Sequence, residues 1–305
     1  MPKMANKVMI VGTGNVGASI AYSLLNQRSA VSELVLVDLD SEDALGEAMD
    51  LRNALAVAPA YLKITASTYA AARDCDVVVI TAGAAQKPGE TRLDLLKKNA
   101  AIMKSIVDPI MASGFSGIFL VITNPVDVLA QVVQEISGLP AERVIGSGTV
   151  LDSARLRGRI AGYLNVSPKS VHASIIGEHG DSEFAVWSLA NVGGQPVTSL
   201  LSAGARADIE TFVKNEAYEI IQKKGSTHYG IGSCAVQILN CILADERRVL
   251  PVSTFHDDVS AYYGFPVVLG RSGVLRPVAL PLSESEAVLL QKSVNILKRA
   301  RKSLA

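Results

Sequence analysis

The first half of the chain alternates short apolar runs with stretches in which apolar residues recur at helical spacing. The largely apolar runs, several of which adjoin glycine or proline, are Val8–Val11, Leu34–Val37, Val77–Thr81, Ile118–Thr123 and Val144–Ile145. Continuous apolar strands are typical of a parallel sheet that is covered on both faces. Amphipathic stretches such as Ala18–Asn26 and Arg92–Val107 supply the covering helices. The pattern therefore predicts an α/β fold around a parallel sheet.

The second half of the chain has a different pattern. Val171–Ile176 and Val186–Leu189 are predicted strands, and Gly193–Pro196 is a predicted turn. Helical spacing returns in three longer segments, Ile209–Lys224, Gly230–Ala244 and Ser283–Leu304. The last of these helices begins with a Ser/Glu capping box.

The change of pattern falls near residues 148–150. A chain of 305 residues is longer than one ordinary hydrophobic core requires. We therefore predict two domains, residues 1–149 and 150–305.

Composition excludes several classes of protein. Lys and Arg number 29, as do Asp and Glu, so no basic excess favours nucleic-acid binding or polybasic membrane association. No apolar run approaches the roughly 18 residues of a transmembrane helix, and Val8–Val11 is too short for a signal-peptide core. The three cysteines are widely spaced and form neither a disulfide framework nor a metal motif. We predict a cytoplasmic protein.

The segment Gly12–Gly17 (GTGNVG) lies between a predicted strand and a predicted helix. Gly12 permits a tight turn, Gly14 allows a pyrophosphate close to the backbone, and Gly17 allows close helix–strand packing. The helix N-terminus offers free N–H groups to the phosphates. Asp38, at the end of the next strand, can accept both ribose hydroxyls of NAD and would repel the 2′-phosphate of NADP. NAD is the predicted cofactor; a plain β–turn–α unit with a surface aspartate is the weaker interpretation.

A second group of residues suggests proton transfer. His179 lies between glycine and acids in the segment GEHGD, and its ordinary pKa of about 6.5 suits proton exchange. Asp152 and Arg155 are three residues apart and would share a helix face. Asp152 could orient His179, and Arg155 could bind a carboxylate with two hydrogen bonds. A surface histidine and a surface ion pair are the alternative interpretations.

Taken together, the motifs resemble the lactate/malate dehydrogenase superfamily, and within it the bacterial-type L-lactate dehydrogenases. The matching segments, in order, are GTGNVG, VDLD, ITAGAAQKPGETRLDLL, VITNPVDV, IGSGTVLDSARLR, IIGEHGDSE and KGSTHYGIG. No structural requirement demands all of these segments jointly, so the set is specific. The resemblance implies a Rossmann-type doubly wound parallel sheet, followed by an α+β domain for substrate binding and catalysis.

The resemblance also implies the reaction, hydride transfer between NADH and pyruvate to give L-lactate. His179, paired with Asp152, would exchange the proton at the substrate C2 oxygen, and Arg92 would polarise the C2 carbonyl. The implied substrate-binding residues are Gln86, Arg92, Asn124, Arg155 and Thr227. The implied cofactor-binding residues are Gly12, Gly14, Val16, Gly17, Asp38, Tyr69, Gly83, Ala84, Ser105, Ile122, Asn124 and Ser147. No metal is required, because Arg92 and His179 would supply the electrophilic assistance.

Gln86 bears on the choice of substrate. In the superfamily this position faces the substituent at C3, and malate dehydrogenases carry arginine there whereas lactate dehydrogenases carry glutamine. A second carboxylate buried without a cation costs several kcal/mol, so Gln86 favours pyruvate over oxaloacetate. The loop 86–92 is expected to close over the site. A malate dehydrogenase or a broader L-2-hydroxy-acid dehydrogenase remains an alternative. A catalytically silent NAD-binding protein is a further one, against which the full set of catalytic residues argues.

The resemblance extends to regulation and assembly. Arg157 and His172 match the positions at which allosteric bacterial relatives bind fructose 1,6-bisphosphate across a subunit interface. An ordinary helix cation and a strand histidine are the alternative interpretation. We expect a homo-oligomer, either a dimer or a tetramer, that serves glycolysis and fermentation. The segment Val252–Gly270 is shorter than is usual in the family, which leaves its strand pairing and the interface geometry open.

Overall fold

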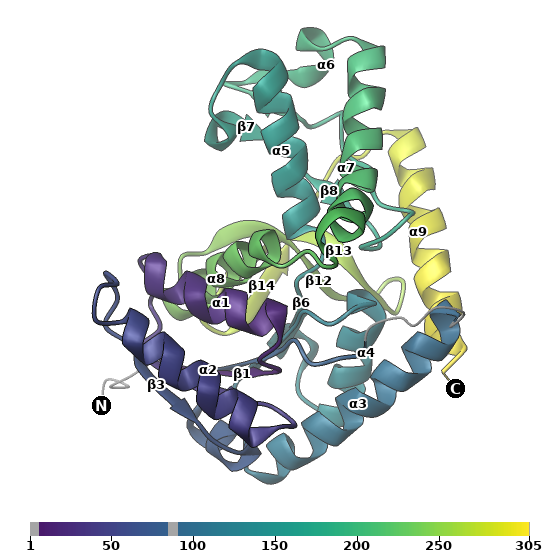
Figure 1. Cartoon of the computed structure of the whole chain (residues 1–305). Helices are drawn as coiled ribbons and strands as arrows, with labels where there is room; N and C mark the ends of the chain where they lie inside the picture. The colour runs from purple at the N-terminus through teal and green to yellow at the C-terminus, as the bar shows by residue number, and fades with distance from the viewer. Residues whose placement is uncertain (1–5, 85–90, 305) are drawn as a thin grey trace.

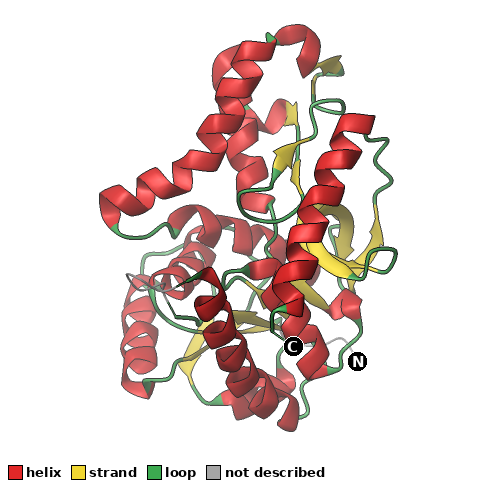
Figure 2. Ribbon diagram, turned by 90° about the vertical axis from the view of Figure 1, so that its right-hand side faces the viewer, coloured by secondary structure: helices red, strands yellow, loops and turns green. Residues whose placement is uncertain are grey.

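The structure, a computed structural model, describes residues 6–84 and 91–304 (Figure 1). Within this part, a nine-stranded sheet runs in the order β14-β13-β12-β6-β5-β4-β1-β2-β3. A second lobe of helices and short strands stands on one side of the sheet (Figure 1; Figure 2). No helix among the described residues has the length and apolar character needed to cross a membrane.

Six strands from the first half form the parallel part of the sheet. They are β1 (Lys7–Val11), β2 (Glu33–Val37), β3 (Lys63–Ala66), β4 (Val77–Ile80), β5 (Ile118–Val121) and β6 (Val144–Gly146). Their spatial order, β3-β2-β1-β4-β5-β6, is that of a doubly wound dinucleotide-binding sheet. Every residue of β4 and β5 is buried, which explains why their sequences are continuously apolar. The predicted parallel sheet is confirmed.

Helices cover both faces of this sheet. They are α1 (Asn15–Asn26), α2 (Ser41–Ala54), α3 (Arg92–Ala112), α4 (Val126–Ser137) and α8 (Tyr229–Leu243). One apolar cluster joins the sheet to α1, α2 and α8, and a second joins it to α3 and α4. Alternate residues of β1 enter the two clusters, Val8 and Ile10 on one face and Met9 and Val11 on the other. Short 3-10 helices, η1 (Tyr69–Asp74) and η2 (Ala141–Arg143), precede β4 and β6.

Three antiparallel strands from the second half extend the same sheet, which the sequence did not predict. They are β12 (Arg248–His256), β13 (Ala261–Gly270) and β14 (Gly273–Pro277). Ser253 of β12 pairs with Gly146 of β6, so the hairpin is joined directly to the parallel part. The sheet is therefore parallel only over the six strands β1 to β6. The sheet also contains strands from both sides of the domain boundary that was predicted between residues 149 and 150. The boundary itself stays a prediction.

The second lobe stands above the sheet in Figure 1. Its elements are α5 (Val150–Leu164), η3 (Pro168–Ser170), β7 (Val171–His172), β8 (Ile175–Ile176), β9 (Phe184–Ala185), β10 (Asn191–Val192), β11 (Gln195–Pro196), α6 (Val197–Leu200) and α7 (Ala203–Lys224). Leu156 and Ile160 of α5 pack with Ile209 and Val213 of α7 in one apolar cluster. The last helix, α9 (Glu284–Lys302), begins with the predicted capping box and contacts α4.

Two predicted strands of this lobe differ from the structure. The segment 171–176 is divided into β7 and β8, which belong to different small sheets. The strand predicted at Val186–Leu189 is wrong, because the strand ends at Ala185 and the following residues form a turn closed by Ala190 N–H and Trp187 O. The Glu286 carboxylate accepts hydrogen bonds from the Ser188 backbone and hydroxyl. This contact with α9 favours the turn over an extended strand.

Candidate active site

The glycine loop after β1 has the geometry that a bound pyrophosphate requires. Gly12 has φ +99°, and a Cβ there would lie 2.6 Å from the backbone nitrogen of Ala82. A Cβ on Gly17 would lie 1.9 Å from Gly12 O, so only glycine allows this approach of helix and turn. Around Gly14, in contrast, there is nothing within 4 Å of an added Cβ. The loop therefore leaves open space at the N-terminus of α1, where anions are favoured.

Asp38 at the end of β2 is fixed beside this loop. Its Oδ2 accepts hydrogen bonds from the Thr13 backbone at 2.6 Å and from the Thr13 hydroxyl at 3.0 Å. Burial favours the neutral acid, but the hydrogen bonds from Thr13 outweigh it and lower the pKa of Asp38. Burial and the charge of Asp38 together raise the pKa of Tyr69, which places these two cofactor candidates near each other. The residues present fit a dinucleotide whose ribose meets a carboxylate.

Other cofactor candidates follow the carboxyl ends of β4, β5 and β6. Gly83 and Ala84 follow β4, Ile122 and Asn124 follow β5, and Ser147 follows β6. Asn99 of α3 accepts a hydrogen bond from Ala84 N–H and donates one to Asn124 O, which ties two of these loops together. The Asn124–Pro125 bond is cis. Val16 lies in the first turn of α1 and packs against the core cluster beneath it.

Ser105 differs from the other cofactor candidates. It lies on an exposed part of α3, where its hydroxyl donates to Ile102 O. Within the described part of the chain, no side-chain hydrogen bond joins Ser105 to the other residues of the set. Its predicted role stays a prediction.

His179, Asp152 and Arg155 meet in the second lobe. His179 Nδ1 lies 2.7 Å from Asp152 Oδ2, and Arg155 Nη1 lies 2.9 Å from Asp152 Oδ1. The predicted spacing on α5 thus brings acid and guanidinium onto one face. Arg155 is also held by Glu216 of α7, at 3.2 Å from its Nε. The pair is therefore not a surface ion pair: Asp152 is 2% exposed, and the side chain of Arg155 is 9% exposed.

The loop that carries His179 is anchored from three sides. Gly177 exchanges two backbone hydrogen bonds with Gly264 of β13. The His179 backbone N–H donates to the Asp127 carboxylate of α4 at 2.8 Å, and the Glu178 N–H donates to the Ser293 hydroxyl of α9 at 2.7 Å. These contacts fix the loop that carries the imidazole relative to β13, α4 and α9.

The electrostatic surroundings hold a proton on His179. Burial by itself lowers the pKa of the imidazole, but the charge and hydrogen bond of Asp152, with Glu183 and Asp127, raise it to about 9. Burial raises the pKa of Asp127 to about 6 despite the hydrogen bond from the His179 backbone. At neutral pH the imidazole is therefore protonated and able to donate.

One further acid belongs to this group. Candidate ligand atoms of Asp152, His179 and Glu183 all lie within 4.8 Å of one another. Both oxygens of Asp152 are already engaged, by His179 and by Arg155. The positive Arg155 guanidinium also lies next to this carboxylate and would repel a metal cation; that no metal is required stays a prediction.

The remaining substrate candidates are placed less fully. Residues 85–90, among them Gln86, lie outside the described residues, as does the side chain of Arg92, so their roles remain predictions. Thr227 lies in the loop between α7 and α8, next to Ser226 and His228, whose side chains contact Asn15 and Ser19 of α1. This brings Thr227 to the end of the glycine loop. Asn124 is exposed at the carboxyl end of β5.

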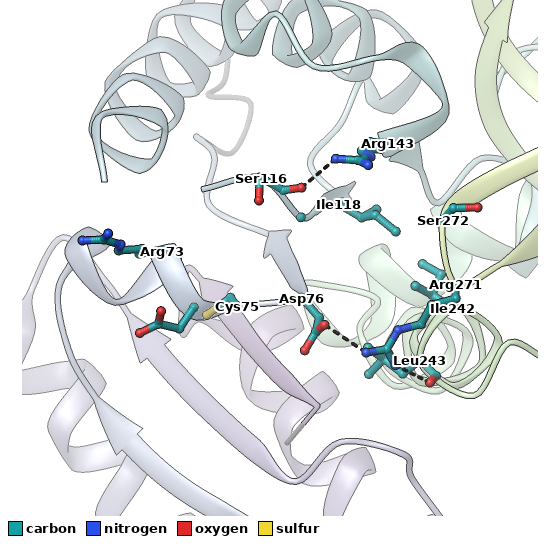
Figure 3. A pocket seen from close by; sticks show the side chains of 12 residues that line it. Arg73, Cys75, Asp76, Ser116, Ile118, Arg143, Ile242, Leu243, Arg271 and Ser272 are labelled. Carbon is teal, nitrogen blue, oxygen red and sulfur yellow. Dashed lines mark hydrogen bonds and ion pairs between the residues drawn. The ribbon is translucent and has the colours of Figure 1, made fainter. Parts of the chain in front are cut away.

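Two cavities lie away from His179. One, of about 260 Å³, contains both Arg157 and His172, the candidate effector residues, and Arg157 donates to Ala173 O at 3.4 Å. The other, of about 310 Å³, lies at the amino ends of β4 and β5 (Figure 3). Its Arg271 is bound to Asp76 and to Leu243 O, and its Arg143 donates to Ser116 O (Figure 3). These arginines join strand ends to neighbouring turns, and we assign no ligand to this second cavity.

Two family models match the chain, one over each half. Residues 6–146 match the model of the lactate/malate dehydrogenase NAD binding domain, and residues 149–305 match that of the lactate/malate dehydrogenase alpha/beta C-terminal domain. The chain belongs to the lactate/malate dehydrogenase family.

Named members of this family are similar over almost the whole chain. An L-lactate dehydrogenase of Bacillus velezensis is 48% identical over 308 residues, 98% of this chain and 97% of that protein. Among solved structures, a lactate dehydrogenase from a Medee basin deep-sea metagenome library has TM-score 0.96 and 48% identity over 99% of both chains. The minor L-lactate dehydrogenase of Enterococcus mundtii in its ligands-bound form has TM-score 0.96 and 44% identity over 99% of both chains. The predicted family, fold class, oxidoreductase class and cofactor are confirmed.

The structure also shows contributors to the site that the sequence analysis did not identify. Asp127 lies in the quoted segment VITNPVDV, so the motif contained it, but nothing in the motif indicated that it binds the His179 backbone. Glu183 closes the segment IIGEHGDSE in the same way. Glu216 of α7 carried no signal at all, since only the packing of α7 against α5 brings it to Arg155.

Proposed function

We propose that the protein is an NAD-dependent L-lactate dehydrogenase that interconverts pyruvate and L-lactate. The observation that carries this proposal is the His179–Asp152 pair, with Arg155 on the second oxygen of Asp152. This arrangement offers a proton donor and a cation that can bind a carboxylate in one cluster, in which Asp152 and Arg155 are buried and His179 is partly exposed. The names of relatives such as the Bacillus velezensis protein support the same activity.

The residues divide the chemical work. When bound, NADH would supply the hydride for reduction, and NAD⁺ would accept it in the reverse reaction. Asp152 binds His179 through Nδ1, which leaves Nε2 to give its proton to the C2 oxygen of a 2-oxo acid. Arg155 holds the substrate carboxylate through its remaining N–H groups. Arg92 and Asn124 polarise the C2 oxygen, and Thr227 lines the pocket.

The same proposal assigns the cofactor contacts and the domains. Residues 1–149 bind NAD and residues 150–305 bind the substrate. The proposed cofactor contacts are the residues named from the resemblance, with Gly12, Gly14, Gly17 and Asp38 best supported by the geometry around Thr13 and α1. Thr13 supports this site by its hydrogen bonds to Asp38, and Asn99 supports it by its hydrogen bonds with Ala84 and Asn124.

Steady-state oxidation of NADH tests the activity. Gln86 has no charge with which to balance the second carboxylate of oxaloacetate, so pyruvate is preferred in kcat/KM by about two orders of magnitude. Gln86→Arg shifts the preference towards oxaloacetate. A wild-type preference for oxaloacetate would assign the protein to the malate dehydrogenases, and equal use of larger 2-oxo acids to a broader 2-hydroxy-acid dehydrogenase. If NADH is not oxidised with any 2-oxo acid, the protein is a catalytically silent NAD-binding protein.

Assembly and regulation complete the proposal. Several helices expose large apolar side chains that a second subunit would cover: Leu45, Met49, Tyr218, Ile221 and Tyr229. We propose a homo-oligomer, a dimer or a tetramer, and light scattering distinguishes the two. Fructose 1,6-bisphosphate is the proposed effector at Arg157 and His172, which share one cavity. The burial of all three cysteines accords with the reducing cytoplasm, where the enzyme serves fermentation.

A further inference from the structure

Glu183 lies against the catalytic pair but is not bonded to it. The residue is 4% exposed, and a carboxylate oxygen lies within 4.8 Å of both Asp152 and the His179 ring. Asp152 has a partner for each of its oxygens. Among the described residues, the Glu183 carboxyl has neither a hydrogen bond nor an ion pair. A buried carboxyl without a partner is costly to ionise, so its position calls for an explanation other than stability.

The charges that face Glu183 come from three elements. Asp152 and Arg155 face it from α5, His179 from its own loop, and Lys214 from α7. His179 is in addition faced by Asp127 of α4. Burial first, and then the charge of Asp152, raise the pKa of Glu183 to about 8, although the nearby cations oppose this. The carboxyl is therefore neutral around pH 7 and gains its charge in the alkaline range.

Glu183 loses its proton at a lower pH than His179 does, and its charge then acts on the imidazole. An anion within about 4–6 Å of an imidazole favours the protonated form. When Glu183 ionises, it adds a negative charge beside an imidazole that is still protonated, since the pKa of His179 is about 9. Loss of the proton from His179 is thereby delayed to higher pH.

We propose that Glu183 is a positioning residue for the proton of His179: its buried, unpartnered carboxyl keeps the imidazole protonated into the alkaline range and so sets the pH at which reduction of the 2-oxo acid gives way to oxidation of the 2-hydroxy acid. The inference rests on the proposed dehydrogenase activity and extends it to control of direction by pH. Glu183 acts through His179 and need not touch the substrate.

The test is the pH profile of kcat/KM for pyruvate between pH 6 and pH 10. In Glu183→Gln the upper pKa of the profile falls by about one unit, because the variant cannot supply the alkaline charge. The ratio of kcat/KM at pH 9 to that at pH 7 then falls roughly fivefold relative to wild type. Oxidation of L-lactate shifts to lower pH by the same amount. Glu183→Asp, which keeps a titrating carboxyl, lies between Gln and wild type.

The matched control is Glu219→Gln, which removes one acid from exposed α7, where Glu219 pairs only with Lys223 in the described contacts. Its profile follows wild type. A Glu183→Gln profile that coincides with wild type, or a shift shared equally by Glu219→Gln, overturns the proposal.

A direct readout separates this inference from the proposed activity. The pKa of His179 is measured by ¹³C NMR of the histidine rings, with the His179 signal identified by its loss in His179→Asn. Glu183→Gln lowers this pKa by about one unit, and an unchanged value overturns the proposal even if pyruvate proves not to be the substrate. Wild type that oxidises no NADH with pyruvate contradicts the proposed function alone.

Discussion

The cofactor loop and the His179 site are built in opposite ways. The glycine loop and Asp38 follow two adjacent strands, β1 and β2, and Thr13 joins them by two hydrogen bonds. The His179 site requires α4, α5, α7 and the loop after β8, which are distant in the chain. The cofactor site is a local arrangement at the carboxyl ends of two neighbouring strands. The His179 site is assembled from elements that are distant in the sequence.

The two sites also treat their acids differently. Hydrogen bonds lower the pKa of Asp38 in spite of its burial, and this carboxylate is ready to accept hydroxyl groups. At the His179 site the acids differ from one another: burial is outweighed by His179 and Arg155, which lower the pKa of Asp152, whereas burial raises the pKa of Asp127 to about 6 and that of Glu183 to about 8. Changes at the cofactor loop should therefore alter only the choice of cofactor. Changes around His179 should alter substrate binding, the catalytic rate and the pH dependence together.

Apart from the replacement of His179 itself, the largest expected effect follows from Asp152→Asn. Asp152 orients His179 and stabilises its protonated form, and a positioned general acid contributes about 10²–10⁴-fold to the rate, so kcat/KM for pyruvate falls by about two to three orders of magnitude. Asp152 also raises the pKa of His179, so the variant loses pyruvate reduction at a lower pH than wild type. The measurement is kcat/KM from pH 5 to pH 10. A fall in rate without any movement of the alkaline limb would contradict the assigned pairing.

Arg155→Lys is next in size. A lysine cannot reproduce the two parallel hydrogen bonds of a guanidinium to a carboxylate, so KM for pyruvate rises about 10- to 100-fold. Arg159→Lys is the control, because Arg159 lies on the same helix but stacks on Phe212. Similar changes in KM for both variants would show that helix α5 was disturbed in general.

Asp38→Ser should change one property only. Removing the carboxylate removes the repulsion of the NADP 2′-phosphate, and the preference for NADH over NADPH narrows by about tenfold or more. KM for pyruvate and the pH profile stay as in wild type. Asp43→Ser, on exposed α2, serves as the control. An altered pH profile in Asp38→Ser would break the distinction between local and assembled sites.

The smallest expected effect concerns the effector cavity. Fructose 1,6-bisphosphate at low pyruvate lowers KM a few-fold, and Arg157→Gln removes the response without changing the basal rate. Titration at pH 6 to 7.5, with oligomeric state followed in parallel, checks this expectation. Unchanged kinetics and assembly in wild type would leave Arg157 an ordinary helix cation.

The same distinction explains what sequence alone could predict. The six parallel strands and the glycine loop follow from short-range patterns, and the spacing of Asp152 and Arg155 follows from one helix. The hairpin of β12 and β13 was not predicted, because its strands obtain their place from pairing with β6 and with each other. Glu216 and Asp127 were missed as partners for a related reason. Their positions depend on helix packing, which no local spacing records.

The most direct test of the account compares NADH binding with turnover in His179→Asn. The proposed cofactor site lies at the carboxyl ends of β1 and β2, and the proposed proton donor lies in the second lobe, so one substitution should separate the two functions. Fluorescence titration should give a Kd for NADH within about twofold of wild type, while kcat for pyruvate falls by roughly two to four orders of magnitude. Turnover that survives the substitution, or NADH binding that is lost with it, would contradict the account.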